Sequence, residues 1–240
     1  MSEHRFDKHL VSLTAPTSFA AEQYQGLRLT VERLGRSRNA QTIAVTSPGA
    51  GEGKTLTAIN LAAALARGSD ARVLLVDADL RRPAVARQLG MADDDAQGLA
   101  DIIARDDLPI DKVAKKIEPF NLWVVRAGTV HGSIHQILRS PRLDAFLKEA
   151  REQFDFVIAD TPPLLPVFDS TLLARAVDGV LVVVSAHHTP RKLLGEALNL
   201  LDGSKVLGIV FNRDDRPLFG YYDAYYREYF PDASGVASEA

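Results

Sequence analysis

Short apolar runs recur along the chain, and most of them are continuous rather than alternating with polar residues. They are rich in β-branched residues and lie at 42–47, 71–79, 122–128, 155–160, 179–186 and 205–212. A continuous apolar run is typical of a strand that is buried on both faces of a sheet. The pattern therefore predicts a strand at each of these places.

Stretches with helical spacing lie between the strands, notably 55–68, 141–153 and 189–203. Thr189 and Pro190 are a favourable start for the last of these helices, and Gly203 a favourable end. Strands that alternate with helices indicate βαβ units. We therefore predict an α/β fold with a doubly wound, mostly parallel sheet.

An amphipathic helix precedes this core, since apolar residues recur there at intervals of three and four. They are Ala20, Tyr24, Leu27, Val31 and Leu34. After Asn212 the regular pattern ends. We divide the chain into an N-terminal arm at 1–40, a core at 41–213 and a C-terminal tail at 214–240.

Composition and charge exclude several classes of protein. The net charge of −3 gives no reason to expect nucleic acid as a partner. The absence of cysteine excludes disulfides and thiolate metal sites. The N-terminus lacks an apolar signal core, and no apolar run approaches the roughly 20 residues that span a bilayer. We expect a soluble cytoplasmic protein, which is compatible with docking at a membrane through a partner.

The glycine-rich segment PGAGEGKT, at 48–55, lies between a predicted strand and an apolar helix. This is the context of a phosphate-binding P-loop, in which backbone N–H groups and the helix N-terminus face the phosphates. Lys54 would reach the β- and γ-phosphates, and Thr55 would offer a hydroxyl to Mg²⁺. Pro48 stands where the strict template has glycine. The candidate nucleotide-binding residues here are Gly49, Gly51, Glu52, Gly53, Lys54 and Thr55.

Two further clusters follow predicted strands. Asp77 and Asp79, with Arg81 and Arg82 behind them, follow a buried strand at the sheet edge where open α/β folds place ligands. Salt-bridged loop aspartates are an equally good interpretation of this stretch alone. Asp160 ends an apolar strand as in a Walker B segment, whose carboxylate holds Mg²⁺. The three clusters in this order favour a nucleotide site far more than any one of them.

These segments, GAGEGKT, LLVDADLR and VIADTP, resemble the bacterial tyrosine autokinases (BY-kinases), and the similarity extends over roughly residues 20–230. The resemblance implies a P-loop fold of the deviant Walker, MinD-like type. It also implies a kinase that uses ATP and Mg²⁺ to phosphorylate tyrosines on the tail of a neighbouring subunit. Its implied partners are a membrane polysaccharide co-polymerase (chain-length determinant) of capsule or exopolysaccharide synthesis, which would hold it at the inner face of the membrane, and a cognate tyrosine phosphatase.

The resemblance assigns roles to individual residues. Lys54 and Arg81 belong to the catalytic set, Asp77 is the candidate general base with Asp79 as the alternative, and Asn212 would read adenine. The metal ligands would be Thr55, Asp79 and Asp160. The phosphoacceptors would be Tyr221, Tyr222, Tyr225, Tyr226 and Tyr229, five of the six tyrosines of the chain. Their helical spacing is equally typical of a packing stripe.

The N-terminal arm departs from the family. The family motif E-x-x-R-x-x-R contributes to ring assembly; here Glu22 and Arg28 match, but Gln25 occupies the middle position. Glutamine cannot reproduce the contacts of a guanidinium. A homo-oligomer is still expected, with the family's ring-shaped octamer in doubt.

Two other functions compete with the kinase. A positioning ATPase resembling the MinD/ParA group shares the fold, but that group has an additional lysine at the position of Gly49. A nucleotide-gated scaffold without kinase activity is the second alternative, and the intact Lys54, Thr55, Asp77 and Asp160 argue against it.

Overall fold

The computed structural model describes residues 6–68, 70–91, 97–105 and 107–214. Among them, seven strands form one sheet in the order β3-β4-β2-β5-β1-β6-β7, with all neighbours parallel except β3 and β4. The strands are β1 (Thr42–Thr46), β2 (Val73–Asp77), β3 (Lys115–Lys116), β4 (Leu122–Val125), β5 (Phe156–Asp160), β6 (Gly179–Ser185) and β7 (Val206–Asn212). The predicted, mostly parallel sheet is confirmed, and the two-residue β3 is an addition to it.

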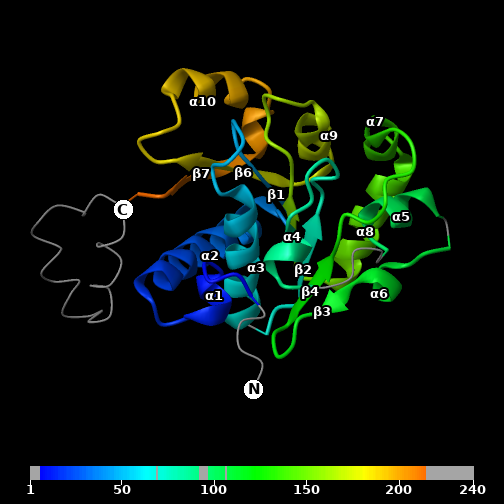
Figure 1. Ribbon diagram of the computed structural model, residues 1–240, viewed down its shortest axis with the longest axis horizontal. Coiled ribbons are helices and arrows are strands. Elements are labelled where there is room, and N and C mark those ends of the chain that lie inside the picture. The colour runs from blue at the N-terminus through cyan, green and yellow to red at the C-terminus, as the bar shows by residue number, and fades with distance from the viewer. Residues whose placement is uncertain (1–5, 69, 92–96, 106, 215–240) are drawn as a thin grey trace, which may run out of the picture.

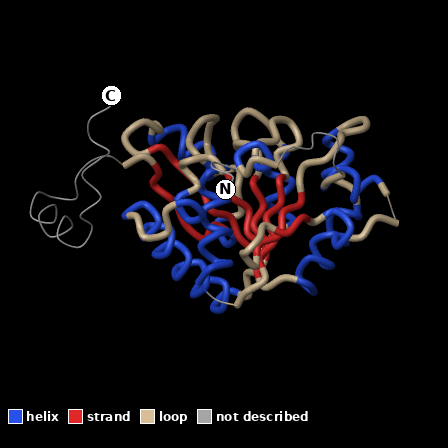
Figure 2. Tube along the Cα trace, turned by 60° about the horizontal axis from the view of Figure 1, so that its bottom comes forward, coloured by secondary structure: helices blue, strands red, loops and turns tan. Residues whose placement is uncertain are grey.

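Helices cover both faces of this sheet (Figures 1 and 2). They are α1 (Val11–Thr14), α2 (Phe19–Arg38), α3 (Lys54–Gly68), α4 (Val85–Gln88), α5 (Leu99–Ala104), α6 (Ile110–Val113), α7 (Ile134–Leu138), α8 (Pro141–Gln153), α9 (Asp169–Ala176) and α10 (Arg191–Leu198), with a 3₁₀ turn, η1 (Gly203–Lys205).

Side chains of successive strand residues enter different cores. Leu75 of β2 packs in the core beneath α1, α2 and α3, whereas its neighbour Leu74 packs in the core beneath α5 and α8. Each side chain is fully buried. Because both faces are covered, both sets of alternating positions must be apolar, which explains the continuous apolar runs.

The predicted N-terminal helix is α2, which packs against α3. The Oγ of Ser18 caps it by accepting from the N–H of Ala21 at 3.2 Å, and Asn39 ends it in the left-handed conformation at φ 51°. One position of the predicted apolar face is wrong: Ala20 is exposed and Ala21 is buried instead. Val31 is fully buried, as the spacing predicted.

Helix α10 is shorter than predicted, since it ends at Leu198 rather than before Gly203. The N–H groups of Leu200 and Leu201 bond to carbonyls only three residues back, which tightens the chain and ends the α-helix. Gly203 begins η1 instead. The Oγ1 of Thr189 does not cap the helix, because it accepts from the N–H of Ser185 at 2.9 Å.

The two edges of the sheet differ. Edge strand β3 has only two residues, Lys115 and Lys116, and both are exposed. The opposite edge strand, β7, pairs with β6 and exposes two large apolar side chains, Ile209 at 38% and Phe211 at 66%. Within the described part of the chain, none of the helices combines the length and apolar character that crossing a bilayer requires.

Candidate nucleotide and phosphoryl-transfer site

The loop between β1 and α3 has the backbone of a phosphate cradle. Gly51 and Gly53 adopt left-handed conformations, with φ of 81° and 90°, which favour glycine. A Cβ on Gly53 would lie 2.0 Å from the side-chain nitrogen of Asn212. Neither Pro48 nor Gly49 has a positive φ, so the proline that departs from the template fits its place in the loop.

Four predicted side chains meet where this loop enters α3. The Nζ of Lys54 lies 3.0 Å from the Oδ2 of Asp79 and 3.3 Å from the Oδ1 of Asp160. The Oγ1 of Thr55 donates to the Oδ2 of Asp160 at 2.7 Å. The residues come from three different strand ends or the loops after them, and the parallel order of the sheet brings those ends together.

Burial and the neighbouring charges shift the pKa values of the side chains in this cluster. Burial raises the pKa of Asp160 to about 6, although Lys54 and Thr55 oppose the shift. Burial also acts to lower the pKa of Lys54, but Asp160 and Asp79 outweigh it, so that its pKa is raised. A lysine held charged between two carboxylates is well suited to exchange them for a phosphate.

Asp77 lies beside Asp160 in the sheet and is 1% exposed. Its Oδ2 accepts from the N–H groups of Ala84 and Val85, each at 3.0 Å, while its Oδ1 meets no hydrogen-bond partner among the described residues. Burial, with Asp160 and Asp79 nearby, raises the pKa of Asp77 to about 7. A carboxyl group with one unbonded oxygen and a pKa near neutrality has the properties of a general base.

Asn212 joins the end of β7 to the phosphate loop. Its Nδ2 donates to the backbone oxygen of Glu52 at 2.9 Å. The Glu52 side chain is buried, and its Oε2 has no hydrogen-bond partner within the ranges that the structure covers. Burial raises the pKa of this carboxyl. Asn212 therefore lies against the candidate site, and its role in reading adenine stays a prediction.

Arg81 is held by a residue to which the sequence drew no attention. Its Nε and Nη2 donate to the Oδ2 and Oδ1 of Asp169, at 2.5 and 3.2 Å. Asp169 is the first residue of α9 and is almost completely buried. The available signal was an aspartate at the start of a helix, which alone is typical of a favourable N-terminus rather than of a site.

The protein oxygens suit a Mg²⁺ ion that is bound together with phosphates. Thr55, Asp79 and Asp160 offer the hard oxygen ligands that Mg²⁺ prefers. Across the described ranges, no group of three or more His, Cys, Asp or Glu side chains could hold a metal by itself. This sparse set fits Mg²⁺, which usually takes one or two carboxylates and completes its shell with water and substrate phosphates.

The predicted phosphoacceptors Tyr221, Tyr222, Tyr225, Tyr226 and Tyr229 lie outside the described residues. The role that we assigned to them stays a prediction.

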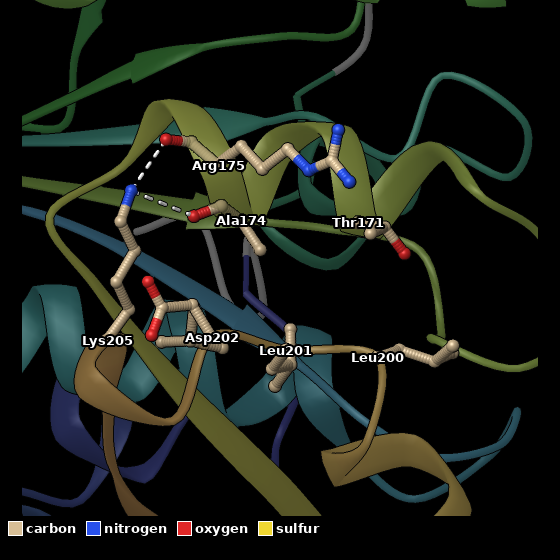
Figure 3. A pocket seen from close by; sticks show the side chains of 8 residues that line it. Thr171, Ala174, Arg175, Leu200, Leu201, Asp202 and Lys205 are labelled. Atoms are coloured by element: carbon tan, nitrogen blue, oxygen red, sulfur yellow. Dashed lines mark hydrogen bonds between the residues drawn. The ribbon is translucent and has the colours of Figure 1, made fainter.

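A hollow of about 390 Å³ beneath α9 is unrelated to this site (Figure 3). Lys205 lines it, and its Nζ donates to the backbone oxygens of Arg175 and Val177 at 2.6 and 2.8 Å. These carbonyls end α9, so the ammonium group caps the helix. Val180, also in the lining, lies near the start of β6, away from the strand ends that carry the phosphate loop.

Residues 40–202 match the model of a family described as an AAA domain. The chain is 30% identical to the tyrosine-protein kinase YwqD of Bacillus subtilis (strain 168), over 91% of this chain and 92% of that protein. It is 33% identical to the succinoglycan biosynthesis transport protein ExoP of Rhizobium meliloti (strain 1021), over 88% of this chain but 27% of that protein. The chain thus spans nearly all of one relative and about a quarter of the other.

Solved structures agree with these relatives. The kinase domain of Escherichia coli tyrosine kinase ETK superposes with a TM-score of 0.80 at 25% identity, over 88% of this chain and 82% of that one. The cell division ATPase MinD of Pyrococcus furiosus superposes less closely, with a TM-score of 0.60 at 24% identity over 79% and 80% of the two chains. The second likeness shows a shared fold and nothing more.

Proposed function

The chain belongs to the family of bacterial tyrosine kinases, and on that premise we propose that it transfers the γ-phosphoryl group of ATP to tyrosines in the tail of a neighbouring copy. It is a P-loop tyrosine-protein kinase of exopolysaccharide or capsule biosynthesis. The nucleotide, the acceptor tyrosines and the roles of individual residues are the parts that we propose.

The observation that carries the proposal is the placement of the Lys54 ammonium between Asp79 and Asp160, at the start of α3. Lys54 would exchange these carboxylates for the β- and γ-phosphates of ATP. The N–H groups of the loop and the N-terminus of α3 would hold the remaining phosphate charge. Positioning and charge neutralisation supply most of the catalysis in phosphoryl transfer.

Thr55 and Asp160 would hold Mg²⁺, with Asp79 in support. When bound, the ion would neutralise charge that develops on the phosphate oxygens. Asn212 would read the adenine, because its amide oxygen can accept from the amino group of the base while its nitrogen stays on the loop.

Asp77 is the proposed general base, which a phenol of pKa about 10 requires at neutral pH. Its Oδ1 can take the proton, whereas both oxygens of Asp79 are engaged by Lys54 and by the N–H of Arg82. Asp77 is buried, so the proton of the tyrosine would pass to its Oδ1 through one water molecule.

We further propose that the protein is cytoplasmic and that a membrane polysaccharide co-polymerase holds it at the inner face of the membrane. A cognate phosphatase would remove the phosphate groups from its tail. Transfer to a neighbouring copy requires self-association. Arg28 donates to Glu32 of its own helix at 3.1 Å, and Gln25 lacks a guanidinium. The missing guanidinium at Gln25 keeps the family's ring-shaped octamer in doubt for this chain.

The test is phosphotyrosine formation by the purified chain with Mg²⁺-ATP. We expect phosphate on the wild type and on Lys112→Met, which removes an exposed lysine. We expect none on Lys54→Met, nor on a variant with Tyr221, Tyr222, Tyr225, Tyr226 and Tyr229 all changed to Phe. ATP turnover without phosphotyrosine would favour a positioning ATPase instead.

A further inference from the structure

The pair between Arg81 and Asp169 connects two segments that both border the phosphate site. Arg81 follows β2, in the same loop as Asp79, and Asp169 begins α9, beyond the strand that ends in Asp160. Two N–H groups of the guanidinium meet both carboxylate oxygens, at 2.5 and 3.2 Å. A two-point contact fixes the orientation of the guanidinium plane as well as its distance.

The Asp169 side of the pair is buried, and its neighbour is hydrogen-bonded to the core. Only 3% of the Asp169 side chain is exposed. The next residue, Ser170, donates its hydroxyl to the backbone oxygen of Pro162, which also accepts from the Oγ1 of Thr46 in β1 at 2.8 Å. Asp169 is therefore fixed relative to the strand end that carries Asp160.

The loop that carries Arg81 is connected to the phosphate site by Asp79. The Oδ1 of Asp79 accepts from the N–H of Arg82 at 3.0 Å, and its Oδ2 contacts Lys54. Of the five N–H groups of Arg81, three remain beyond the two that Asp169 accepts. The Arg81 side chain is 46% exposed, so these groups are open to a ligand.

A role in stability alone accounts poorly for this arrangement. An ion pair whose guanidinium is half-exposed adds little to stability, and an apolar residue could fill the buried start of α9 at least as well. A buried carboxylate that fixes the direction of a half-exposed guanidinium is suited to orienting that guanidinium toward an anionic group.

On the basis of the proposed function, we propose that Asp169 is a positioning residue for phosphoryl transfer. It holds Arg81 so that the free N–H groups of the guanidinium face the transferred phosphoryl group as it meets its acceptor. Nucleotide binding depends on the phosphate loop and is largely independent of Asp169. Loss of Asp169 therefore lowers the rate of transfer more than it lowers nucleotide affinity.

The experiment separates enzyme from acceptor. The enzyme is the full chain with its five tail tyrosines changed to Phe, and the acceptor is the full chain carrying Lys54→Met. Initial rates of phosphotyrosine formation against acceptor concentration give kcat and KM, and titration with Mg²⁺-ADP gives a Kd. The variants are Asp169→Asn, Asp169→Glu, Arg81→Gln, and the double variant of Asp169→Asn with Arg81→Gln. The control is Asp107→Asn, which changes an exposed pair with Arg105 that also has two contacts, at 3.3 and 3.4 Å.

We expect Asp169→Asn to lower kcat/KM by about 10- to 100-fold, the size of effect that a misplaced group produces, with the Kd for Mg²⁺-ADP changed by less than about threefold. Asp169→Glu should recover part of the rate, and Asp107→Asn should match the parent enzyme. The double variant should be no slower than Arg81→Gln, because Asp169 acts through Arg81. The double variant also leaves no buried charge unpaired, so its rate can still be measured if a single variant folds poorly.

An unchanged rate for Asp169→Asn would overturn the inference. Additive losses in the double variant would also overturn it. So would a fall in the transfer rate that is accompanied by an equally large fall in ADP affinity and by a loss of thermal stability. If the parent enzyme transfers no phosphate to the acceptor, the proposed function fails and the inference fails with it. If the Asp169→Asn variant transfers phosphate at the parent rate, the inference is wrong but the proposed function stands.

Discussion

At the scale of single residues, the site is a set of buried charges that offset one another. Lys54 contacts two carboxylates, and Thr55 donates to one of them. Asp77, beside them, forms no ion pair among the described residues, and its Oδ1 has no hydrogen-bond partner there. The free protein therefore holds one carboxyl group in an environment that disfavours its charge.

This environment predicts that Asp77→Asn stabilises the protein at alkaline pH. The pKa of Asp77 is raised to about 7 by burial, against roughly 3.9 in an unfolded chain. Between these values the folded state binds the proton more tightly, so the free energy of unfolding falls as pH rises. We expect Asp77→Asn to exceed the wild type by roughly 1 to 4 kcal/mol at pH 8, and by almost nothing at pH 4.

Urea denaturation without metal or nucleotide measures both values. Asp70→Asn, at an exposed position, is the control and should change neither. An equal gain at both pH values would show that the stabilisation does not come from the proton of Asp77.

At the scale of elements, the phosphate loop depends on the end of a strand far away in the sequence. The side chain of Asn212, which ends β7, occupies the place where a side chain on Gly53 would lie. The Asn212 amide group bonds to the same loop at Glu52. The geometry of the loop is therefore set jointly by β1, α3 and β7.

Gly53→Ala should weaken nucleotide binding and stability together. The φ of 90° strains an alanine, and the added Cβ would lie 2.0 Å from the Nδ2 of Asn212. We expect a loss of about 1 to 3 kcal/mol in the free energy of unfolding and at least tenfold in affinity for Mg²⁺-ADP. Gly26→Ala is the control: it lies within α2 with open space around it, and should stabilise by about 0.5 to 1 kcal/mol.

Asn212→Ala removes the hydrogen bond to Glu52 by itself, so it is measured alone as well. The loss caused by Gly53→Ala should be smaller in the Asn212→Ala background than in the wild type, but not zero, because the backbone strain remains. An equal loss in both backgrounds would contradict the contact, and no loss in the Asn212→Ala background would contradict a role for the φ of Gly53.

The sequence predicted the elements well and their contacts unevenly. The apolar runs located six strands, and the motifs located Lys54, Asp79 and Asp160, because a parallel sheet necessarily brings the ends of its strands to one edge. Asp169 escaped prediction because its importance comes from a partner on another segment. The end of α10 was misplaced because the turn after Leu198 tightens before the glycine is reached.

At the scale of the whole molecule, the N-terminal arm is packed into the fold. Leu10 and Val31 are fully buried against the core. The side chain of Asn60, in α3, accepts from the N–H of Ser12 at 2.9 Å and donates to the backbone oxygen of His9 at 3.0 Å. The arm therefore covers the same helix that begins with Lys54.

Deletion of residues 1–40 should lower the thermal midpoint sharply or prevent folding, because it uncovers the apolar face of α3. Asn60→Ala, a milder change, should cost about 1 to 3 kcal/mol by leaving a buried N–H without its acceptor. Thr30→Ala, on the exposed face of α2, should change the free energy of unfolding by less than about 0.5 kcal/mol.

Thermal unfolding at several protein concentrations distinguishes packing from assembly. A deletion variant that folds as stably as the intact chain, and loses only its self-association, would contradict a role for the arm in the fold.

The unequal edges of the sheet limit how copies of this chain can join strand to strand. The edge at β3 is two residues long and carries two lysines, so a second sheet gains little there and meets positive charge. The edge at β7 is seven residues long and presents Ile209 and Phe211. If two copies pair through β7, each presents its lysine edge outward, and growth stops at the pair. The short lysine edge therefore opposes fibre formation, since a fibre needs two edges on every unit that can pair.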